Sequence, residues 1–232
     1  MAVMARTDSI QVLDHGFVRL DGCMADDLSV VNGARVSFGQ RSEELDERDS
    51  GLIRFLMRER HGSPFEHNAF RFHIKLPIFV MREWARHRIG SFNEWSGRYS
   101  QLEPEFYVPE PEDVRTQVGK PGAYSFDPVA DDVAERARAA QREVYEHAYR
   151  AYVEMLDDGV AREVARNVLP VAIYTQFYWT VNARSLMNFL SLRNAPTAQR
   201  EIRRYAEAVE LLFAGVMPVT HAAFVENGRR SP

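Results

Sequence analysis

Asn68-Ala69-Phe70-Arg71-Phe72-His73-Ile74-Lys75 is the stretch of this sequence that decides the fold. Large apolar side chains alternate in it with charged or polar ones. A period of two is the pattern of a strand that buries one face and exposes the other. The stretch therefore predicts a half-buried strand over residues 68–75.

The segments on either side of this strand alternate between short strand patterns and helical ones. The predicted elements are a strand pair over 10–20, helices over 27–37 and from about 50 to 61, a helix from 77 to about 88 or 89, a loop over 101–126, the longest helix over 127–158, and helices over 160–169, 182–192 and 197–217. Residues 171–181 fit either a strand or a buried helix. The predicted class is α+β: a central, largely antiparallel sheet packed with several helices, with one long helix at about 127–158. No linker or repeat interrupts the chain, so a single domain over 1–232 is expected.

Composition excludes several classes of protein. Of 232 residues, 45% are apolar and 27% are charged, as in soluble globular proteins, and the net charge of −4 argues against a chain built to coat nucleic acid. No segment has the length of a membrane span and the first residues do not resemble a signal peptide, so a cytoplasmic protein is expected. Cys23 is the only cysteine, which excludes an internal disulfide and cysteine-rich metal clusters. It has no basic partner beside it and is interpreted as a small buried side chain.

The segment Arg86-His-Arg-Ile-Gly-Ser-Phe-Asn-Glu-Trp-Ser-Gly-Arg-Tyr99 carries the densest group of functional side chains. Arg86 and Arg88 are two residues apart, so on a helix they point to opposite sides. If the following segment is extended, Glu94, Ser96 and Arg98 share one side and offer an acceptor, a hydroxyl and a forked cation. Arginine binds phosphate oxygens in pairs, and the mixture suits a planar, phosphorylated ligand. The alternative is a solvated basic helix end.

Three other groups are less specific. Residues 61–67 hold two histidines and a glutamate, but their spacing matches no common metal site, and a hydrogen-bonding turn is expected instead of a metal. Arg162 and Arg166 share a helix face, where favourable placement at a helix end is the alternative to binding. Arg184 and Asn188 share a face of a mostly apolar helix and need partners, either internal or in a ligand. There is no glycine fingerprint for a dinucleotide.

The sequence is similar to the flavin-dependent thymidylate synthases at these same positions. Arg86-His-Arg-x-x-Ser-x-Asn-Glu-x-Ser-x-Arg-Tyr99 matches the signature of that family, and the segments 61–67, 162–170 and 182–189 resemble its other motifs in order. The resemblance covers about residues 10–225. It implies methylation of dUMP to dTMP, with 5,10-methylenetetrahydrofolate as carbon donor and NADPH-reduced FAD as hydride source. It also implies a homotetramer whose sites are shared between subunits, with no nucleic acid or membrane as partner.

The resemblance implies a role for each matching residue. The expected FAD-binding residues are Ser63, Arg86, His87, Arg88, Glu94, Asn182, Arg184 and Asn188. The expected dUMP-binding residues are Glu83, Arg86, Glu94, Ser96, Arg98, Arg166 and Arg193. Arg193 is the expected catalytic residue, since a fixed cation against the N3–C2=O edge of uracil stabilises the negative charge that grows there.

Three further points limit the resemblance or support it. Glu83 stands where many members carry glutamine, and Thr197 stands where relatives often carry histidine. The single cysteine lies far from every motif, so no enzyme thiolate is expected to attack the substrate. The alternatives are a nucleic-acid-binding protein that uses the basic segment, and a flavoprotein of the same fold that does not methylate.

Overall fold

The computed structural model describes residues 9–120 and 122–232, which divide into two compact units. Unit 1 contains the described residues up to Lys75 together with Val80–Glu94 and Gln176–Pro232, and unit 2 contains Leu76–Phe79 and Trp95–Thr175. The single domain predicted over residues 1–232 stays a prediction. No helix in the described ranges is both long and apolar enough to cross a membrane.

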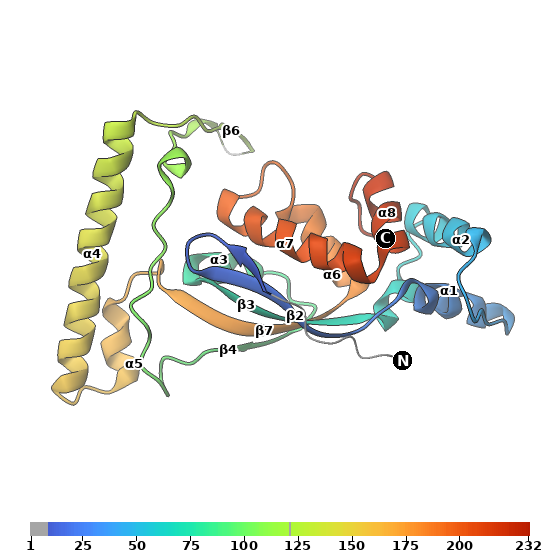
Figure 1. Ribbon diagram of the computed structural model, residues 1–232, viewed down its shortest axis with the longest axis horizontal. Helices are drawn as coiled ribbons and strands as arrows, with labels where there is room; N and C mark the ends of the chain where they lie inside the picture. The colour runs from blue at the N-terminus through green and yellow to red at the C-terminus, as the bar shows by residue number, and fades with distance from the viewer. Residues whose placement is uncertain (1–8, 121) are drawn as a thin grey trace. The chain divides into compact units, whose positions relative to one another are not determined.

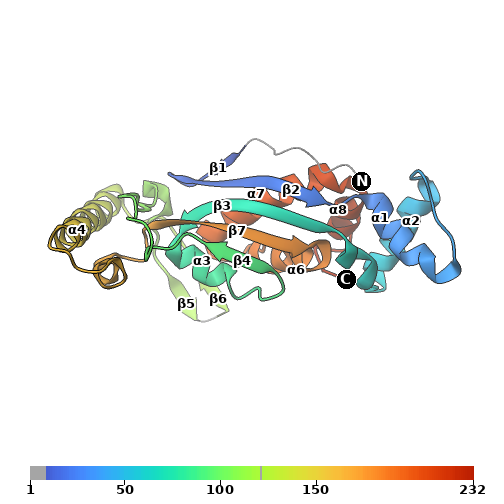
Figure 2. The ribbon, with the colours of Figure 1, turned by 90° about the horizontal axis from the view of Figure 1, so that it is seen from below.

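A five-stranded sheet is the main feature of unit 1 (Figure 2). Its strands, in spatial order, are β1 (Ile10–Val12), β2 (Gly16–Met24), β3 (Ala69–Pro77), β7 (Tyr174–Asn182) and β4 (Ser91–Glu94). β1 pairs antiparallel with β2, β2 with β3, and β4 with β7. The predicted α+β class and antiparallel sheet are confirmed, and the segment that fitted either a strand or a helix forms β7.

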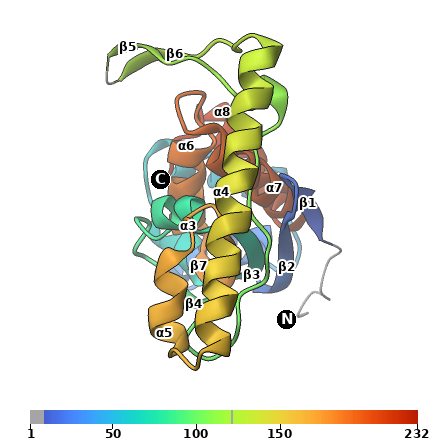
Figure 3. The same cartoon turned by 90° about the vertical axis from the view of Figure 1, so that its left-hand side faces the viewer.

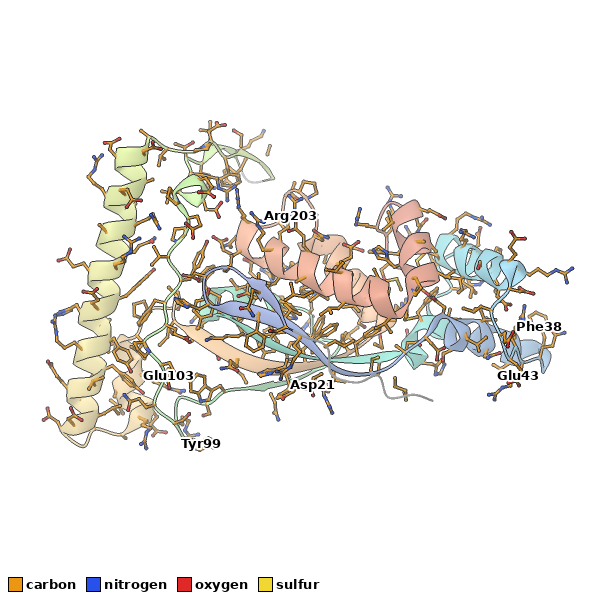
Figure 4. All side chains as sticks on the ribbon, viewed as in Figure 1. Asp21, Phe38, Glu43, Tyr99, Glu103 and Arg203 are labelled. Atoms are coloured by element: carbon orange, nitrogen blue, oxygen red, sulfur yellow. The ribbon has the colours of Figure 1, made fainter. Side chains whose placement is uncertain are left out.

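Helices cover one face of this sheet. The helices of unit 1 are α1 (Asp27–Arg35), α2 (Glu47–Arg58), α6 (Ala183–Arg193), α7 (Arg200–Val216) and α8 (Pro218–Glu226), with most of α3 (Ile78–Trp84) and the short 3-10 segments η1 (Val36–Phe38) and η2 (Ser63–His67). In Figure 1, α6 and α7 lie along the sheet. Phe70, Phe72 and Ile74 of β3 are fully buried, while Asp21 of β2 points away from these helices (Figure 4).

Unit 2 is built on the long helix α4 (Asp131–Asp157). Beside it runs α5 (Arg162–Ala165), followed by η4 (Arg166–Val168), as Figure 3 shows. The segment before α4 forms η3 (Pro111–Asp113) and a hairpin of β5 (Val118–Lys120) and β6 (Ala123–Ser125), where a loop was predicted. Tyr149 and Tyr152 of α4 bind the backbone of Leu102 at 3.0 and 3.2 Å, which fixes the start of this segment on the helix.

Two predicted helix boundaries are wrong for a local reason. The long helix begins at Asp131 and not at 127, because the backbone of residues 127–129 pairs with that of residues 114–116. The helix predicted to reach residue 88 or 89 ends at Trp84, and Arg86 N–H and His87 N–H bond three residues back in a turn. β4 then begins at Ser91 and pairs with β7.

Candidate active site

Arg193 is the last residue of α6, and each nitrogen of its side chain donates a hydrogen bond. Its Nε donates to His87 Nε2 at 3.0 Å, Nη1 to Glu83 Oε2 at 2.9 Å, and Nη2 to the backbone oxygen of Glu83 at 3.1 Å. The side chains of Arg193 and Glu83 are only 18% and 24% exposed. Contacts on three nitrogens fix the plane of the guanidinium, so this cation is held in place before any ligand arrives.

The surroundings of His87 favour the neutral form of its ring. Burial, together with the charges of Arg193 and Arg86, lowers the pKa of His87 to about 4. A neutral ring can accept the proton of Arg193 Nε at its own Nε2, whereas an imidazolium would repel the guanidinium. Burial also raises the pKa of Glu83, although the charge of Arg193 opposes that rise.

The low pKa of His87 predicts a loss of stability in mild acid. Unfolded His87 takes up a proton near its ordinary value of 6.5, but the folded protein takes it up only near 4. Between these values the unfolded state binds more protons, so the free energy of unfolding falls as the pH drops from 6.5 towards 4. Urea unfolding of the wild type and His87→Gln at several pH values measures this loss. We expect the variant to lose less stability over that range, and equal losses would contradict the assignment to His87.

A second cluster surrounds Arg184, in the first turn of α6. Arg184 Nη1 donates to Glu66 Oε1 at 2.5 Å and Nε to the backbone oxygen of Pro232 at 3.0 Å. The guanidinium crosses directly over Gly62, where a Cβ atom would lie 2.6 Å from Arg184 Cζ. Ser63 follows Gly62 at the start of η2 and is exposed. Gly62 therefore provides the space that Arg184 needs to cross this turn.

Two asparagines of α6 and its N-cap, Asn182 and Asn188, differ in their hydrogen bonding. Asn182 is the N-cap of the helix, and its side chain accepts from Ser185 N–H at 2.8 Å. Asn188 lies on the exposed side. The sequence predicted partners for Arg184 and Asn188 on a mostly buried helix. Arg184 has internal partners, whereas the exposed side chain of Asn188 has no hydrogen-bond partner within the described residues.

Arg86 and Arg88 lie in the turn after α3 and are exposed. Within the described residues, no carboxylate lies within ion-pair distance of either guanidinium. These two guanidinium groups, one on each side of His87 in the sequence, suit an anionic group such as a diphosphate. Because the helix has already ended, the predicted opposite orientation on a helix does not apply to them.

In unit 2, Ser96, Arg98 and Arg166 lie around one turn. Ser96 O accepts from Tyr99 N–H at 3.0 Å, and Arg98 N–H donates to Ser96 Oγ at 3.3 Å. A Cβ on Gly97 would contact the Cδ atom of Arg166 at 3.4 Å. The extended conformation predicted from Glu94 to Arg98 is therefore wrong beyond Glu94, because β4 ends there and a turn follows.

Of two carboxylates in these clusters, Glu163 was not predicted as a site residue, and Glu66 was predicted only to hydrogen-bond a ligand or a helix end from the turn at 61–67. Glu163 Oε2 accepts from Arg98 Nε at 2.9 Å, and Glu66 binds Arg184. Both stand inside motifs that the sequence marked, but only the folded chain shows which arginine each one meets. The Arg98–Glu163 pair is more than half exposed on both sides, so it contributes about 0–1 kcal/mol and is easily displaced by a stronger anion.

Cys23 lies near the end of β2 and is 7% exposed. Its strand partner is Phe70. Cys23 belongs to unit 1, whereas the turn that carries Arg98 belongs to unit 2. The prediction of a buried cysteine is confirmed.

Comparison with known proteins gives three findings. A family model described as "Thymidylate synthase complementing protein" matches residues 20–219. The chain is 49% identical over 216 residues to a flavin-dependent thymidylate synthase of Kosmotoga olearia, covering 93% of both chains, and 49% identical over 218 residues to one of Thermotoga neapolitana, covering 94% of both. It also resembles the crystal structure of a UMP/dUMP methylase, PolB, from Streptomyces cacaoi bound with 5-Br dUMP, with a TM-score of 0.86 and 46% identity over 96% of this chain and 100% of that one.

Proposed function

The chain belongs to the family of flavin-dependent thymidylate synthases, whose cofactor is FAD, and on this basis we propose that it methylates dUMP with Arg193 as its catalytic cation. The carbon donor is 5,10-methylenetetrahydrofolate and the reductant is NADPH. The observation that carries the proposal is the three-point fixation of the Arg193 guanidinium by Glu83 and His87.

FAD carries a diphosphate, and the chain's arginines have the chemistry to hold it. Arg86 and Arg88 are exposed and lack a carboxylate partner within the described residues, and Arg184 is 45% exposed despite its bonds to Glu66 and Pro232. The further residues proposed to hold FAD are Ser63, His87, Glu94, Asn182 and Asn188. When bound, FAD supplies the hydride for the uracil ring.

His87 is the residue of this set whose role is best supported by a contact, and the contact is with Arg193. We therefore propose that His87 Nε2 holds the Arg193 guanidinium. The other atoms of the imidazole ring remain available to contact the flavin. Asn182 already caps α6, so its side chain supports the position of Arg184 within the first helical turn.

Arg193 has the properties of a group that stabilises a transition state. Reduction at C6 of uracil moves negative charge onto O4, N3 and O2. A cation that is fixed beforehand gains more attraction as this charge grows than it has for the neutral ring. Because its orientation is already set by Glu83 and His87, little reorganisation is needed during the reaction.

The phosphate of dUMP is assigned to Ser96, Arg98 and Arg166. A phosphate dianion competes well with Glu163 for Arg98, because that ion pair is largely exposed and weak. The remaining residues proposed to contact dUMP are Glu83, Arg86, Glu94 and Arg193. We also propose a homotetramer, supported by family membership, which light scattering of the purified protein tests.

The proposed reaction is tested by a single-turnover assay. The purified protein should be yellow and show flavin absorbance. After reduction, it should form dTMP when dUMP and methylenetetrahydrofolate are added. UMP is offered in parallel, because the solved relative is described as a UMP/dUMP methylase. Protein that stays colourless after incubation with FAD would exclude the flavoprotein functions and favour nucleic-acid binding through the 86–99 segment, which would show a strong salt dependence. A yellow protein that forms no dTMP would be a non-methylating flavoprotein.

The position of Cys23 predicts that its thiol is dispensable. We expect Cys23→Ala to form dTMP at a rate within about twofold of the wild type, since no thiolate attack is part of the reaction. The lost buried sulfur costs about 1 kcal/mol of stability. Thermal melting checks that the variant is folded, and a folded variant without activity would show that the thiol takes part.

A further inference from the structure

Glu210 is a buried carboxylate on α7 to which the proposed function gives no role. Its side chain is only 8% exposed, and a charge at such a depth is strongly unfavourable unless it is paired. Oε1 accepts from His221 Nε2 at 2.9 Å and from Arg229 Nε at 3.1 Å, and Oε2 accepts from the side-chain amide of Asn194. Burial alone would raise the pKa of Glu210, but these hydrogen bonds and the charge of Arg229 lower it, so the carboxylate is ionised at neutral pH.

The three donors come from three different segments that meet at α7. Asn194 is the C-cap of α6, His221 lies on α8, and Arg229 follows the end of α8. All three helices lie above the sheet in the view of Figure 1. The Glu210 carboxylate therefore ties the end of α6 to α8 and to the segment that follows α8.

The last turn of α6 is attached to this cluster at a second point. The Ser191 hydroxyl donates to the backbone oxygen of Arg229 at 2.6 Å, and the guanidinium of the same Arg229 binds Glu210. The last carbonyl groups of a helix have no partner within the helix, and helix ends fray for this reason. Here the chain is held on both sides of Arg193, at Ser191 before it and at Asn194 after it.

The cluster fixes the end of the Arg193 side chain that Glu83 and His87 do not hold. Those two residues fix the guanidinium, whereas the position of the Cα atom depends on the last turn of α6. A displacement of a catalytic group by about 1 Å can slow a reaction by about 10²-fold. We propose that Glu210 is a positioning residue for Arg193, which acts by holding Asn194 and with it the backbone from which Arg193 reaches the site. The inference rests on the proposed function, in which Arg193 is the catalytic cation.

The test measures single-turnover dTMP formation and dUMP affinity in the FAD-loaded protein. Asn194→Ala removes the amide that Glu210 holds but leaves that carboxylate its other two donors, so the fold should survive. We expect its rate to fall by about tenfold, less than for Arg193→Ala, because Glu83 and His87 still hold the guanidinium. The dissociation constant of dUMP should stay within about twofold of the wild type. Glu210→Ala should slow the reaction at least as much.

A double-mutant cycle separates positioning from a general structural role. If Asn194 acts through Arg193, the double variant Arg193→Ala/Asn194→Ala should react at the rate of Arg193→Ala alone, within about twofold. A general structural role would multiply the two losses and make the double variant about tenfold slower than Arg193→Ala. The matched control is Glu207→Ala, which removes an exposed carboxylate of α7 whose partner is Arg203. Its rate should stay within about twofold of the wild type.

The outcomes distinguish this inference from the proposed function. A wild-type rate in Asn194→Ala, a loss of dUMP affinity as large as the loss of rate, or multiplied losses in the double variant would each overturn the inference while dUMP methylation stands. A wild type that forms no dTMP, or an Arg193→Ala protein with a normal rate, would overturn the inference together with the proposed role of Arg193. If Glu210→Ala does not fold, the Asn194 variants still decide the question.

Discussion

Arg193→Ala is expected to lower the rate of dTMP formation by about 10²–10³-fold, the effect seen when one fixed donor to a developing oxyanion is removed. The dissociation constant of dUMP should rise by less than about tenfold, because the ground-state ring carries no net charge at this edge. Single-turnover rates and nucleotide titrations measure the two effects separately. The reverse pattern, with weak dUMP binding and a normal rate at saturation, would remove the transition-state role from Arg193.

Two comparisons separate this effect from local damage. Removing the guanidinium leaves the partly buried Glu83 carboxylate without its partner, so the melting temperature of Arg193→Ala must be measured beside its activity. Arg193→Lys keeps the charge but cannot bind His87 and Glu83 at once, and we expect an intermediate rate. Arg203→Ala is the control, since Arg203 lies on α7 (Figure 4) and its ion-pair partner is Glu207 on the same helix.

Gly62→Ala is expected to lower the affinity for FAD by about 10–100-fold, the loss that follows when charge-assisted hydrogen bonds are broken. The new Cβ would lie 2.6 and 2.9 Å from Cζ and Cδ of Arg184, so the guanidinium must leave Glu66 and Pro232. Because the atoms that move belong to a flexible side chain, the fold should survive. Flavin absorbance after gel filtration, and titration of the apoprotein with FAD, measure the loss.

A second glycine offers a matched control for this variant. A Cβ on Gly51, within α2, would meet no atom within 4 Å, so Gly51→Ala should bind FAD like the wild type and gain a little helix stability. Adding Gly62→Ala to Arg184→Ala should have no further effect if both act through the same guanidinium. Additive losses would mean that Gly62 serves FAD by another route.

The sequence predicted the strands of the sheet where apolar and polar side chains alternate, but it did not predict where the helices end. The alternation in residues 68–75 predicts β3 correctly, because the apolar residues of a half-buried strand occupy every second position. After α3 ends at Trp84, the chain enters β4, which pairs with residues 177–180 of β7, far later in the chain. A boundary set by a distant partner leaves no local signal.

The same distinction holds for the candidate site. Motif resemblance identified Arg193 and His87, but it assigned them to different ligands, and their contact at 3.0 Å joins residues 106 positions apart. The partner of Arg98 could not be predicted either, since Glu163 reaches it through a turn at residues 96–99 that the sequence suggested was extended. The sequence identified these residues as members of the site, but only the fold shows which of them contact one another.

The strand order of the sheet has a consequence for synthesis of the protein on the ribosome. β7 lies between β3 and β4, yet it is translated long after both of them. Until β7 emerges, the edges of β3 and β4 that it will join have no partner, and such edges can pair with other nascent chains. A cell that makes this protein at a high rate should therefore depend on chaperones that shield these strands, and slower translation of residues 95–175 would lengthen the period of risk.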